Sequence, residues 1–362
     1  MKKVMINGYF VDKHINGIPR YAMEIVKRLD KNFAQGEIEL IVPKNAINIP
    51  NLDNIQVIRI GKKDERTAGI LWGNTYFRKY VCEHNAGCIN FTNHAEFVRN
   101  SLTTLHDAIW SRKDKYELEL LQKENRKLFL KRLIERGVFY SEAYVKKKTA
   151  QYIITVSEFS KVRIAREFGI EHNRIKVIGA GWEHMKGIQS VNEFNDSRIC
   201  KNNYFFSLGN IYPHKNVKWI IDEAKRMPEE IFVIAGKMPY KFVDVFKEDF
   251  PNIIFLGHIS EGFMKYLMEN CKALLFPSLE EGFGVPPLEA LSLGTQVIVS
   301  DIPVMREIYK DTVHYIDPVG KPVDLNEILN KKTNGDISEI LEKHSWDETA
   351  KQWEQLIREV YA

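Results

Sequence analysis

The chain has 362 residues, 44% of them hydrophobic, so it is long enough for two or three domains and can bury a large core. This excludes a disordered protein, a collagen-like repeat and a small disulfide-stapled scaffold. The 52 basic and 48 acidic residues are evenly spread and leave a net charge of +4, which is too mild for a nucleic-acid-binding surface. We therefore expect no nucleic acid among its partners.

The four cysteines, Cys82, Cys88, Cys200 and Cys271, show no C-x-x-C spacing. A core of this size needs no disulfides, so we expect all four to be reduced. Cys82, His84 and Cys88 would need a further pair of ligands at finger spacing to hold zinc, and none follows. We expect no metal site.

The sequence shows neither a signal peptide nor a membrane-spanning stretch. The apolar run at residues 4–6 is shorter than the core of a signal peptide. No stretch reaches the roughly 18 uncharged apolar residues that a membrane span needs. We therefore expect a cytoplasmic protein.

Short β-rich runs alternate with segments of helical period along the whole chain. This alternation is typical of parallel sheets built from βαβ units, and it predicts an α/β fold with two Rossmann-like, doubly wound domains. The expected strands of the first sheet are 3–7, 37–42, 55–60, 88–91, 102–105, 152–156 and 175–178. Those of the second sheet are 204–208, 231–235, 253–256, 273–276, 296–299 and 314–316.

The segment 179–203 is polar, contains Gly, Ser and Asn, and has neither period, so it is the expected domain boundary. We expect an N-terminal domain over 1–185 and a C-terminal domain over 200–345. A last helix over 347–362 has no strand after it, and packing on either domain stays open.

Open α/β sheets bind ligands at the carboxyl ends of their strands, so two such domains facing one another would enclose a cleft. The loop after the first strand leads to Gly17 at the start of a helix. A glycine there allows an anion to approach the free N–H groups closely, although a plain turn explains it equally well. Pro19 in the first helical turn removes one donor.

The loop after 204–208 carries His214 and Lys215 just before a helix. A lysine at the top of a sheet suits a diphosphate as a point charge, and a histidine can donate one hydrogen bond. The alternative is a solvated lysine on a loop.

The third loop follows the apolar strand 273–276 and is acidic and glycine-rich. Gly282 and Gly284 let backbone N–H groups turn toward a ligand, and the N-terminus of the next helix adds partial positive charge. Glu281 and Glu289, separated by seven residues, can accept hydrogen bonds from sugar hydroxyls. Alternatively, Glu289 complements the helix dipole and Glu281 is solvated.

Residues 281–294 resemble the Glu-x7-Glu signature of retaining glycosyltransferases with the GT-B fold, in particular glycosyltransferase family 4, also called group 1. The resemblance extends along most of the chain through the ordered blocks GIPRYA, HDAIW, TVSEFSK, SLGNIYPHKN, VIAGK, FLGHISEGFMKYL and SDIPVMREIYKD. It implies two Rossmann-like domains facing a central cleft. It also implies a nucleotide-diphosphate sugar as donor substrate, with no cofactor.

In this family the donor lies mainly on the C-terminal domain and the acceptor mainly on the N-terminal one. The resemblance implies that Lys215 holds the diphosphate, Glu281 contacts the donor sugar and Glu289 binds the ribose hydroxyls. Implied catalytic residues are Lys215, Glu281 and His106, the last facing the donor sugar. Implied donor-binding residues are Gly17, His214, Lys215, Gly282, Phe283, Gly284, Val285 and Glu289.

Breaking the anomeric bond leaves new negative charge on the diphosphate, so fixed cations and amide dipoles must face the leaving oxygens. Lys215 and the helix N-terminus supply them. The sequence has no Asp-x-Asp pair to hold a metal. We expect metal-independent catalysis and, from the family, retention by front-face attack. A covalent glycosyl-enzyme is disfavoured, because nothing in the sequence brings Glu281 to the anomeric carbon.

Three positions depart from the family. His214 stands where an arginine is common, so the diphosphate clamp loses a bidentate partner and becomes sensitive to pH near neutrality. Pro19 stands where a second glycine is frequent. Ala180-Gly181, followed by Trp182 and Glu183, replaces the usual Asn-Gly at the domain boundary.

The segment 111–148 holds twelve Lys and Arg against six acidic residues, with Leu and Phe at helical spacing. Such a stretch can lie on an anionic membrane, which would bring the enzyme to a lipid-linked acceptor. A helix packed on its own domain with a solvated face explains it equally well. Peripheral contact with the cytoplasmic face of the inner membrane therefore stays open.

The sequence predicts a retaining, metal-independent hexosyl or deoxyhexosyl transferase of surface polysaccharide or lipopolysaccharide biosynthesis. Its expected partners are a nucleotide sugar and a glycan or polyprenyl-diphosphate-linked saccharide acceptor. A sugar-nucleotide epimerase or hydrolase, or a non-catalytic sugar-nucleotide-binding subunit, is the alternative. A nicotinamide-dependent oxidoreductase would need G-x-G-x-x-G after the first strand, which Gly8 and Gly17 do not provide.

Overall fold

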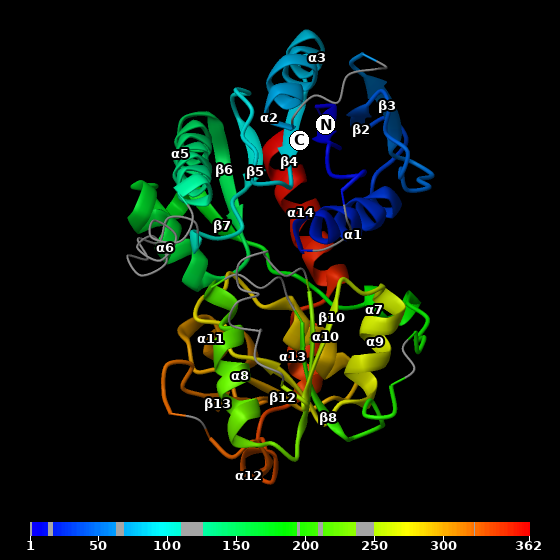
Figure 1. Ribbon diagram of the computed structural model, residues 1–362. Coiled ribbons are helices and arrows are strands. Elements are labelled where there is room, and N and C mark those ends of the chain that lie inside the picture. Colours follow the sequence, from blue (N-terminus) through cyan, green and yellow to red (C-terminus); the bar gives the residue numbers. More distant parts are fainter. Residues whose placement is uncertain are drawn as a thin grey trace. The chain divides into compact units, whose positions relative to one another are not determined.

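The computed structural model describes residues 2–13, 17–62, 69–109, 126–193, 196–208, 213–236, 250–321 and 323–362. The chain forms two compact units: the first comprises Met1–Ala180 and Trp346–Ala362, and the second Gly181–Ser345. Each unit is built on one parallel sheet with helices on its faces, as Figure 1 shows. The predicted α/β class with two Rossmann-like sheets is therefore confirmed.

The first unit has a seven-stranded sheet of order β3-β2-β1-β4-β5-β6-β7. Every residue of β1, β4 and β5 is buried, so both faces of these strands are covered, as expected for a parallel sheet between helices. The strands are β1 (Val4–Asn7), β2 (Ile38–Pro43), β3 (Gln56–Ile60), β4 (Gly87–Asn90), β5 (Ser101–Thr104), β6 (Ala150–Thr155) and β7 (Ile175–Val177).

The helices of the first unit begin and end at recognisable signals. In α6, the Ser157 hydroxyl accepts the Ser160 N–H at the start, and Gly169 takes the left-handed conformation (φ 59°) at the end. The helical segments are α1 (Gly17–Asn32), α2 (Gly69–Trp72), η1 (Gly73–Phe77), α3 (Arg78–Glu83), α5 (Arg126–Thr149), α6 (Glu158–Phe168), η3 (His172–Arg174) and α14 (Trp346–Tyr361).

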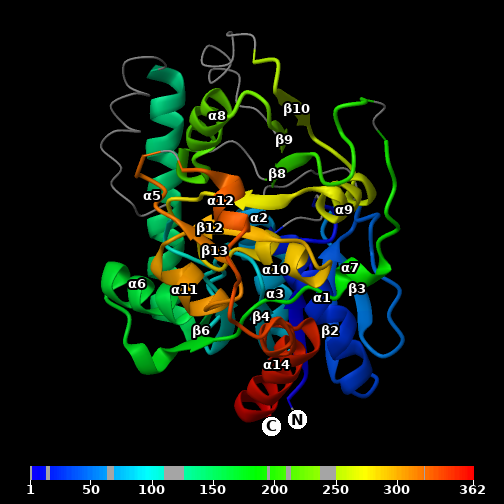
Figure 2. The same cartoon turned by 90° about the horizontal axis from the view of Figure 1, so that it is seen from below.

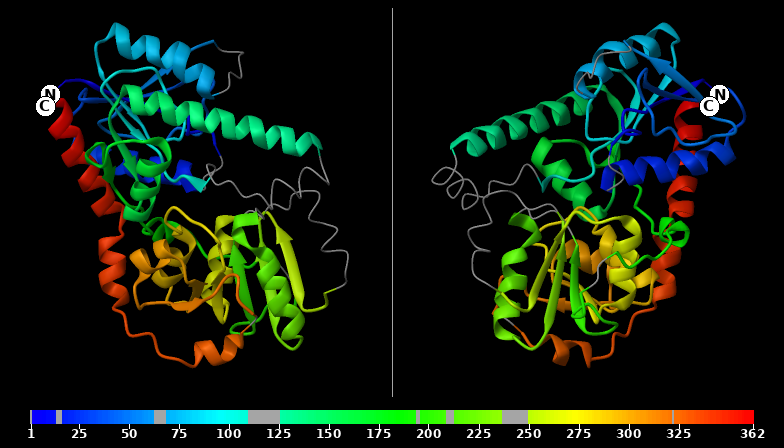
Figure 3. Two further views of the ribbon diagram at one scale, coloured as in Figure 1. Left: turned by 90° about the vertical axis from the view of Figure 1, so that its left-hand side faces the viewer. Right: turned by 45° about the vertical axis from the view of Figure 1, so that its right-hand side comes forward.

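The last helix, α14, belongs to the first unit and packs against α1. Its Trp353 is fully buried and donates a hydrogen bond to the Tyr21 hydroxyl at 2.9 Å. The Tyr361 hydroxyl donates to the carbonyl of Cys88, in β4, at 3.0 Å. The Lys2 N–H donates to the Tyr361 carbonyl, which brings the two ends of the chain together (Figure 3).

The second unit has a six-stranded sheet of order β10-β9-β8-β11-β12-β13, whose apolar face is filled by side chains of α8 and the strands. The strands are β8 (Tyr204–Leu208), β9 (Ile231–Ala235), β10 (Ile253–Gly257), β11 (Ala273–Phe276), β12 (Val297–Ser300) and β13 (His314–Ile316). The helical segments are α7 (His184–Gly187), η4 (Pro213–Lys215), α8 (Val217–Arg226), α9 (Glu261–Asn270), α10 (Val285–Ser292), α11 (Pro303–Tyr309), α12 (Leu325–Leu329) and α13 (Ile337–Lys343).

One predicted boundary needs correction. Residues 181–185, expected with the N-terminal domain, fall in the second unit. The physical reason is that the Trp182 indole N–H donates to the Leu341 carbonyl on α13, and His184 contacts Glu289 on α10. Figure 2 shows α7 and α10 in the view from below, and Figure 1 also labels α13.

Each sheet has one point at which the strand order reverses, and parallel α/β sheets bind ligands in the crevice there. In the first unit it lies between β1 and β4, which pair directly with each other. In the second it lies between β8 and β11. The loops after these four strands are therefore the places to look for chemistry.

All four cysteines are free, as predicted. Within the ranges given above, no three His, Cys, Asp or Glu side chains are grouped so as to hold a metal ion. None of the helices described in those ranges has the length and apolar character needed to cross a membrane.

Candidate active site

Lys215 and Glu281 meet at the strand-order reversal of the second unit. Lys215 ends η4, which follows β8, and Glu281 lies in the loop after β11. The Lys215 Nζ lies 2.5 Å from the Glu281 Oε1, and the side chains are only 22% and 9% exposed. The two residues that the sequence singled out from loops 66 positions apart thus form one ion pair.

The backbone around Lys215 is held by the neighbouring loop. Asn216 adopts the left-handed conformation (φ 55°), and its amide donates to the carbonyls of Pro277 and Pro318. The Leu279 N–H donates to the His214 carbonyl at 2.7 Å. The Lys215 ammonium also lies over the Phe276 ring, 5.0 Å from its centre. These contacts place a cation at the carboxyl end of β11.

The glycine loop after Glu281 turns sharply into α10. Gly284 is left-handed (φ 89°), a conformation that residues with a side chain rarely adopt, and a Cβ there would lie 2.6 Å from the Met305 Cε. Its carbonyl accepts a hydrogen bond from the buried Tyr309 hydroxyl. Pro286 and Pro287 have no N–H, so the first-turn amides that can face a ligand are those before Pro286.

Phe283 and Gly282 complete this loop. The Phe283 ring is buried and meets His344 edge to face, with ring centres 5.3 Å apart. Burial lowers the pKa of His344 to about 4, so this imidazole is neutral at neutral pH. Phe283 therefore serves as packing beneath the loop, while Gly282 lies between it and Glu281.

Glu289 lies on the first turns of α10, only 10% exposed, and its Oε1 is 2.9 Å from the Nε2 of His184. Sequence analysis did not predict a role for His184. The sequence marked the neighbouring Trp182 and Glu183 only as a departure from the family. No local pattern could connect His184 with Glu289, because the two residues are 105 positions apart.

Gly17 and His106, the other implied residues, belong to the first unit. Gly17 begins α1 with φ 45°, and a Cβ there would meet nothing within 4 Å, so its backbone conformation is what favours glycine. The Nε2 of His106 lies 2.9 Å from the Phe91 carbonyl oxygen, which can only accept, so Nε2 carries a hydrogen. Burial lowers the pKa of His106 to about 4. The ring is therefore neutral and its Nδ1 is an acceptor.

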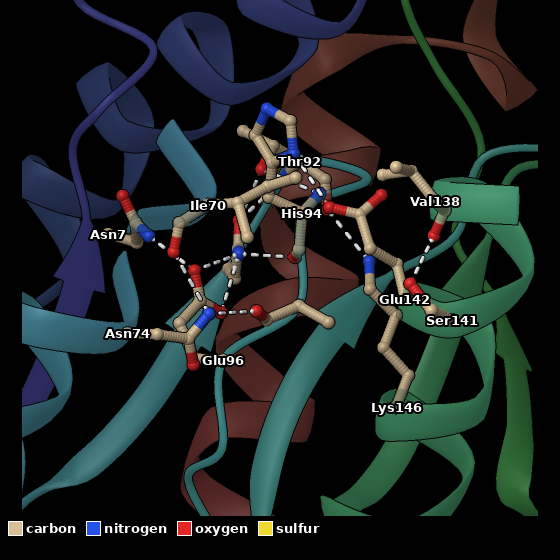
Figure 4. A network of polar contacts seen from close by, with 12 residues as sticks. Asn7, Ile70, Asn74, Thr92, His94, Glu96, Val138, Ser141, Glu142 and Lys146 are labelled. Carbon is tan, nitrogen blue, oxygen red and sulfur yellow. Dashed lines mark hydrogen bonds and ion pairs between the residues drawn. The ribbon is translucent and has the colours of Figure 1, made fainter. Parts of the chain in front are cut away.

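A polar network that the sequence did not predict occupies the strand-order reversal of the first unit (Figure 4). Asn7 ends β1, Asn90 ends β4, and both amides donate to the buried carboxyl of Glu96, at 2.5 Å and 2.6 Å from Oε1. Burial raises the pKa of Glu96. The chain itself thus fills this position with a carboxyl group.

The same network reaches α5 (Figure 4). The Lys146 ammonium is buried and donates to the carbonyls of Thr92 and Thr104. Burial lowers its pKa to about 8, against the opposing influence of Glu142 and Glu96. The His94 Nδ1 lies 2.9 Å from the Glu142 Oε1, and His94 is 40% exposed. These contacts fix α5 to the loops after β4 and β5.

Comparison with solved structures identifies the architecture. The chain aligns with sucrose-phosphate synthase from Thermosynechococcus elongatus at a TM-score of 0.69 and 15% identity, covering 100% of this chain and 99% of that one. It aligns with WaaG, a glycosyltransferase involved in lipopolysaccharide biosynthesis, at a TM-score of 0.60 and 15% identity, covering 99% and 96%. The chain has the GT-B fold.

Sequence comparison relates part of this GT-B chain to known glycosyltransferases. Residues 191–353 match the family described as Glycosyl transferases group 1. The O-antigen chain mannosyltransferase RfbU of Salmonella typhimurium is 30% identical over 259 residues, which cover 69% of this chain and 63% of that protein. The O-antigen chain mannosyltransferase B of Escherichia coli is 24% identical over 217 residues, which cover 56% and 54%. The chain thus spans less than two thirds of either relative.

The matched range contains Lys215, Glu281 and Glu289 and leaves out His184, Gly17 and His106. The match to the group 1 family therefore includes the ion pair and the glycine loop of the second unit. Of the blocks that carried the resemblance, three lie partly outside the described residues: HDAIW at Trp110, SLGNIYPHKN at residues 209–212 and VIAGK at Lys237.

The neutral state of His106 predicts an effect on acid stability. The folded pKa is lowered to about 4 from an ordinary 6.5, so below pH 6.5 the unfolded chain takes up a proton that the folded chain does not. The free energy of unfolding should therefore fall as the pH falls toward 4. In H106Q this contribution disappears, so the variant should gain about 3 kcal/mol relative to wild type between neutral pH and pH 4. Urea unfolding across this range measures the difference, and a constant offset at every pH would contradict the neutral ring.

Proposed function

We propose that the chain is a glycosyltransferase that moves a hexosyl or deoxyhexosyl group from a nucleotide-diphosphate sugar to a glycan or lipid-linked glycan. The observation that carries the proposal is the Lys215–Glu281 ion pair beside a glycine loop, at the strand-order reversal of a unit that matches group 1 glycosyltransferases. Since the two sequence relatives named above are O-antigen chain mannosyltransferases, surface polysaccharide biosynthesis is the proposed setting. A mannosyl donor is the first to test.

Charge explains how these groups act. The bond from the anomeric carbon to the diphosphate oxygen breaks, and negative charge develops on the diphosphate. The Lys215 ammonium has three hydrogens, so it can keep its bond to Glu281 and still donate to a phosphate oxygen. Glu281 then accepts a hydrogen bond from a hydroxyl of the donor sugar. Glu289 accepts hydrogen bonds from the ribose.

Retention is the proposed stereochemistry. The acceptor hydroxyl attacks the face from which the diphosphate departs, and its proton goes to the departing phosphate oxygen. One carbon–oxygen bond breaks and another forms on the same face, so no protein nucleophile is needed. An epimerase or hydrolase of the same fold would consume the nucleotide sugar without an acceptor. Product analysis with and without acceptor separates these reactions.

Removing the cation tests the role of Lys215. K215A should lower the turnover number with donor and acceptor by about a hundredfold, because one fixed electrostatic donor to the leaving group is lost. K218A is the matched control, since Lys218 is 76% exposed and pairs with Asp222 on the surface of α8. Steady-state kinetics measures both. Equal rates for K215A and wild type would contradict the proposed role.

We also propose that catalysis needs no divalent metal, because the sequence has no Asp-x-Asp pair and Lys215 and the loop amides supply the positive charge. Activity should persist in excess EDTA at a rate close to that of the untreated enzyme. The rate after dialysis against chelator, with and without added manganese, measures this. Complete loss of activity that manganese restores would refute metal independence.

We propose further that the enzyme works in the cytoplasm and that α5 brings it to a membrane surface that carries the acceptor. Four apolar side chains on α5 are exposed at helical spacing: Leu130 (50%), Leu133 (42%), Ile134 (67%) and Val138 (38%). The helix carries eight Lys and Arg against two Glu, and the seven other than the buried Lys146 suit anionic lipid. Residues 111–125 of the basic segment lie outside the described residues.

Binding to vesicles tests this part of the proposal. L133S/I134S should sediment with vesicles that contain anionic phospholipid several-fold less than wild type, because apolar area for insertion is lost. L71S is the control, because Leu71 is 60% exposed but lies on α2. If L133S/I134S and wild type partition equally, α5 does not dock.

A further inference from the structure

The first residues of the second unit reach directly into the candidate donor site. His184 is 3% exposed and Glu289 is 10% exposed, and the His184 Nε2 lies 2.9 Å from the Glu289 Oε1. A carboxylate oxygen can only accept, so the Nε2 carries the hydrogen in this bond. His184 lies outside the range that matches the group 1 family. It therefore adds a group that the family match does not provide.

The backbone that carries His184 is fixed on two sides. The Lys265 ammonium on α9 donates to the carbonyls of Met185 and Ile188, at 2.9 Å each. The Trp182 indole donates to the Leu341 carbonyl at 3.0 Å. A helix of four residues such as α7 is not stable alone, so these bonds hold it in place. The imidazole consequently meets Glu289 from a fixed frame.

Glu289 is held along its backbone, and among the residues that the structure describes His184 is the hydrogen-bond partner of its carboxylate. Its carbonyl accepts a hydrogen bond from the Ser292 hydroxyl at 2.7 Å, and α10 begins directly after the left-handed Gly284. The terminal torsion of a glutamate is broad, so its two oxygens have no preferred direction unless a partner sets one. A bond to Oε1 sets the direction of Oε2 as well.

Stability alone gives a weak reason for this pair. Taking two polar, ionisable groups out of water costs free energy that their mutual attraction offsets only in part, and apolar residues of similar volume often do as well. What an apolar pair would not supply is a defined direction for a carboxylate oxygen.

We propose that His184 is a positioning residue for donor binding: it orients the Glu289 carboxylate to accept hydrogen bonds from the ribose diol of a nucleoside diphosphate. This rests on the proposed function, in which Glu289 contacts the ribose. The diol is the feature that separates ribonucleotides from 2′-deoxyribonucleotides. His184 should therefore control the preference for ribose without touching the ligand.

Calorimetric titration with GDP, UDP and their 2′-deoxy counterparts tests the inference on the full chain. For the nucleotide that binds wild type more tightly, the ribose form should bind about tenfold more tightly than the deoxy form, as expected for one hydrogen bond to a charged group. E289A and H184L should both bring this ratio close to one. H184Q keeps a donor and should restore most of the ratio. H172L, on the exposed turn η3 of the first unit, is the control.

The outcomes separate the inference from the proposed function. If H184L keeps the wild-type ratio while E289A loses it, His184 only packs and the inference is wrong. If E289A also keeps the ratio, or neither nucleotide binds wild type, the proposed donor site is wrong and the inference falls with it. Thermal unfolding checks that each variant is folded. H184M, which also lacks a ring donor, takes the place of H184L if the leucine variant does not fold.

Discussion

The ion pair between Lys215 and Glu281 is the contact on which the candidate site depends. It requires that β8 and β11 be neighbours, so that the loops after them meet, and it requires the left-handed Asn216 that ties one loop to the other. A lysine held by a carboxylate stays in place before a ligand arrives, and a ligand with phosphate oxygens then meets a fixed positive charge. The glycine turn beside it lets the backbone approach the same ligand closely.

Both units have a parallel sheet whose strand order reverses at one point, but different groups occupy that point in the two units. Where the strand order reverses in the first unit, the chain places the Glu96 carboxyl between two asparagine amides, with a buried lysine nearby. Where it reverses in the second unit, it places the partly exposed Lys215 beside the glycine loop of residues 281–284. Parallel α/β folding provides the crevice, and the residues at the strand ends decide whether the chain or a ligand fills it.

Much of the fold could be predicted from the sequence, because buried parallel strands appear as short apolar runs, such as 204–208 and 273–276, whose ends match β8 and β11. The approach of Lys215 to Glu281 followed from loops at the ends of parallel strands. The contact of His184 with Glu289 could not be predicted, because it joins residues 105 positions apart through the packing of α7 on α10. The bonds of Asn7 and Asn90 to Glu96, and the packing of α14 on α1, likewise depend on tertiary contacts that leave no local pattern.

The most direct test of the central claim is an experimental structure of the full chain with a nucleoside diphosphate or nucleotide sugar bound. We predict that a phosphate oxygen lies within hydrogen-bonding distance of the Lys215 ammonium and faces the backbone of residues 282–285, with the ribose beside Glu289. A diphosphate bound elsewhere, with the Lys215–Glu281 pair untouched by ligand, would contradict the account.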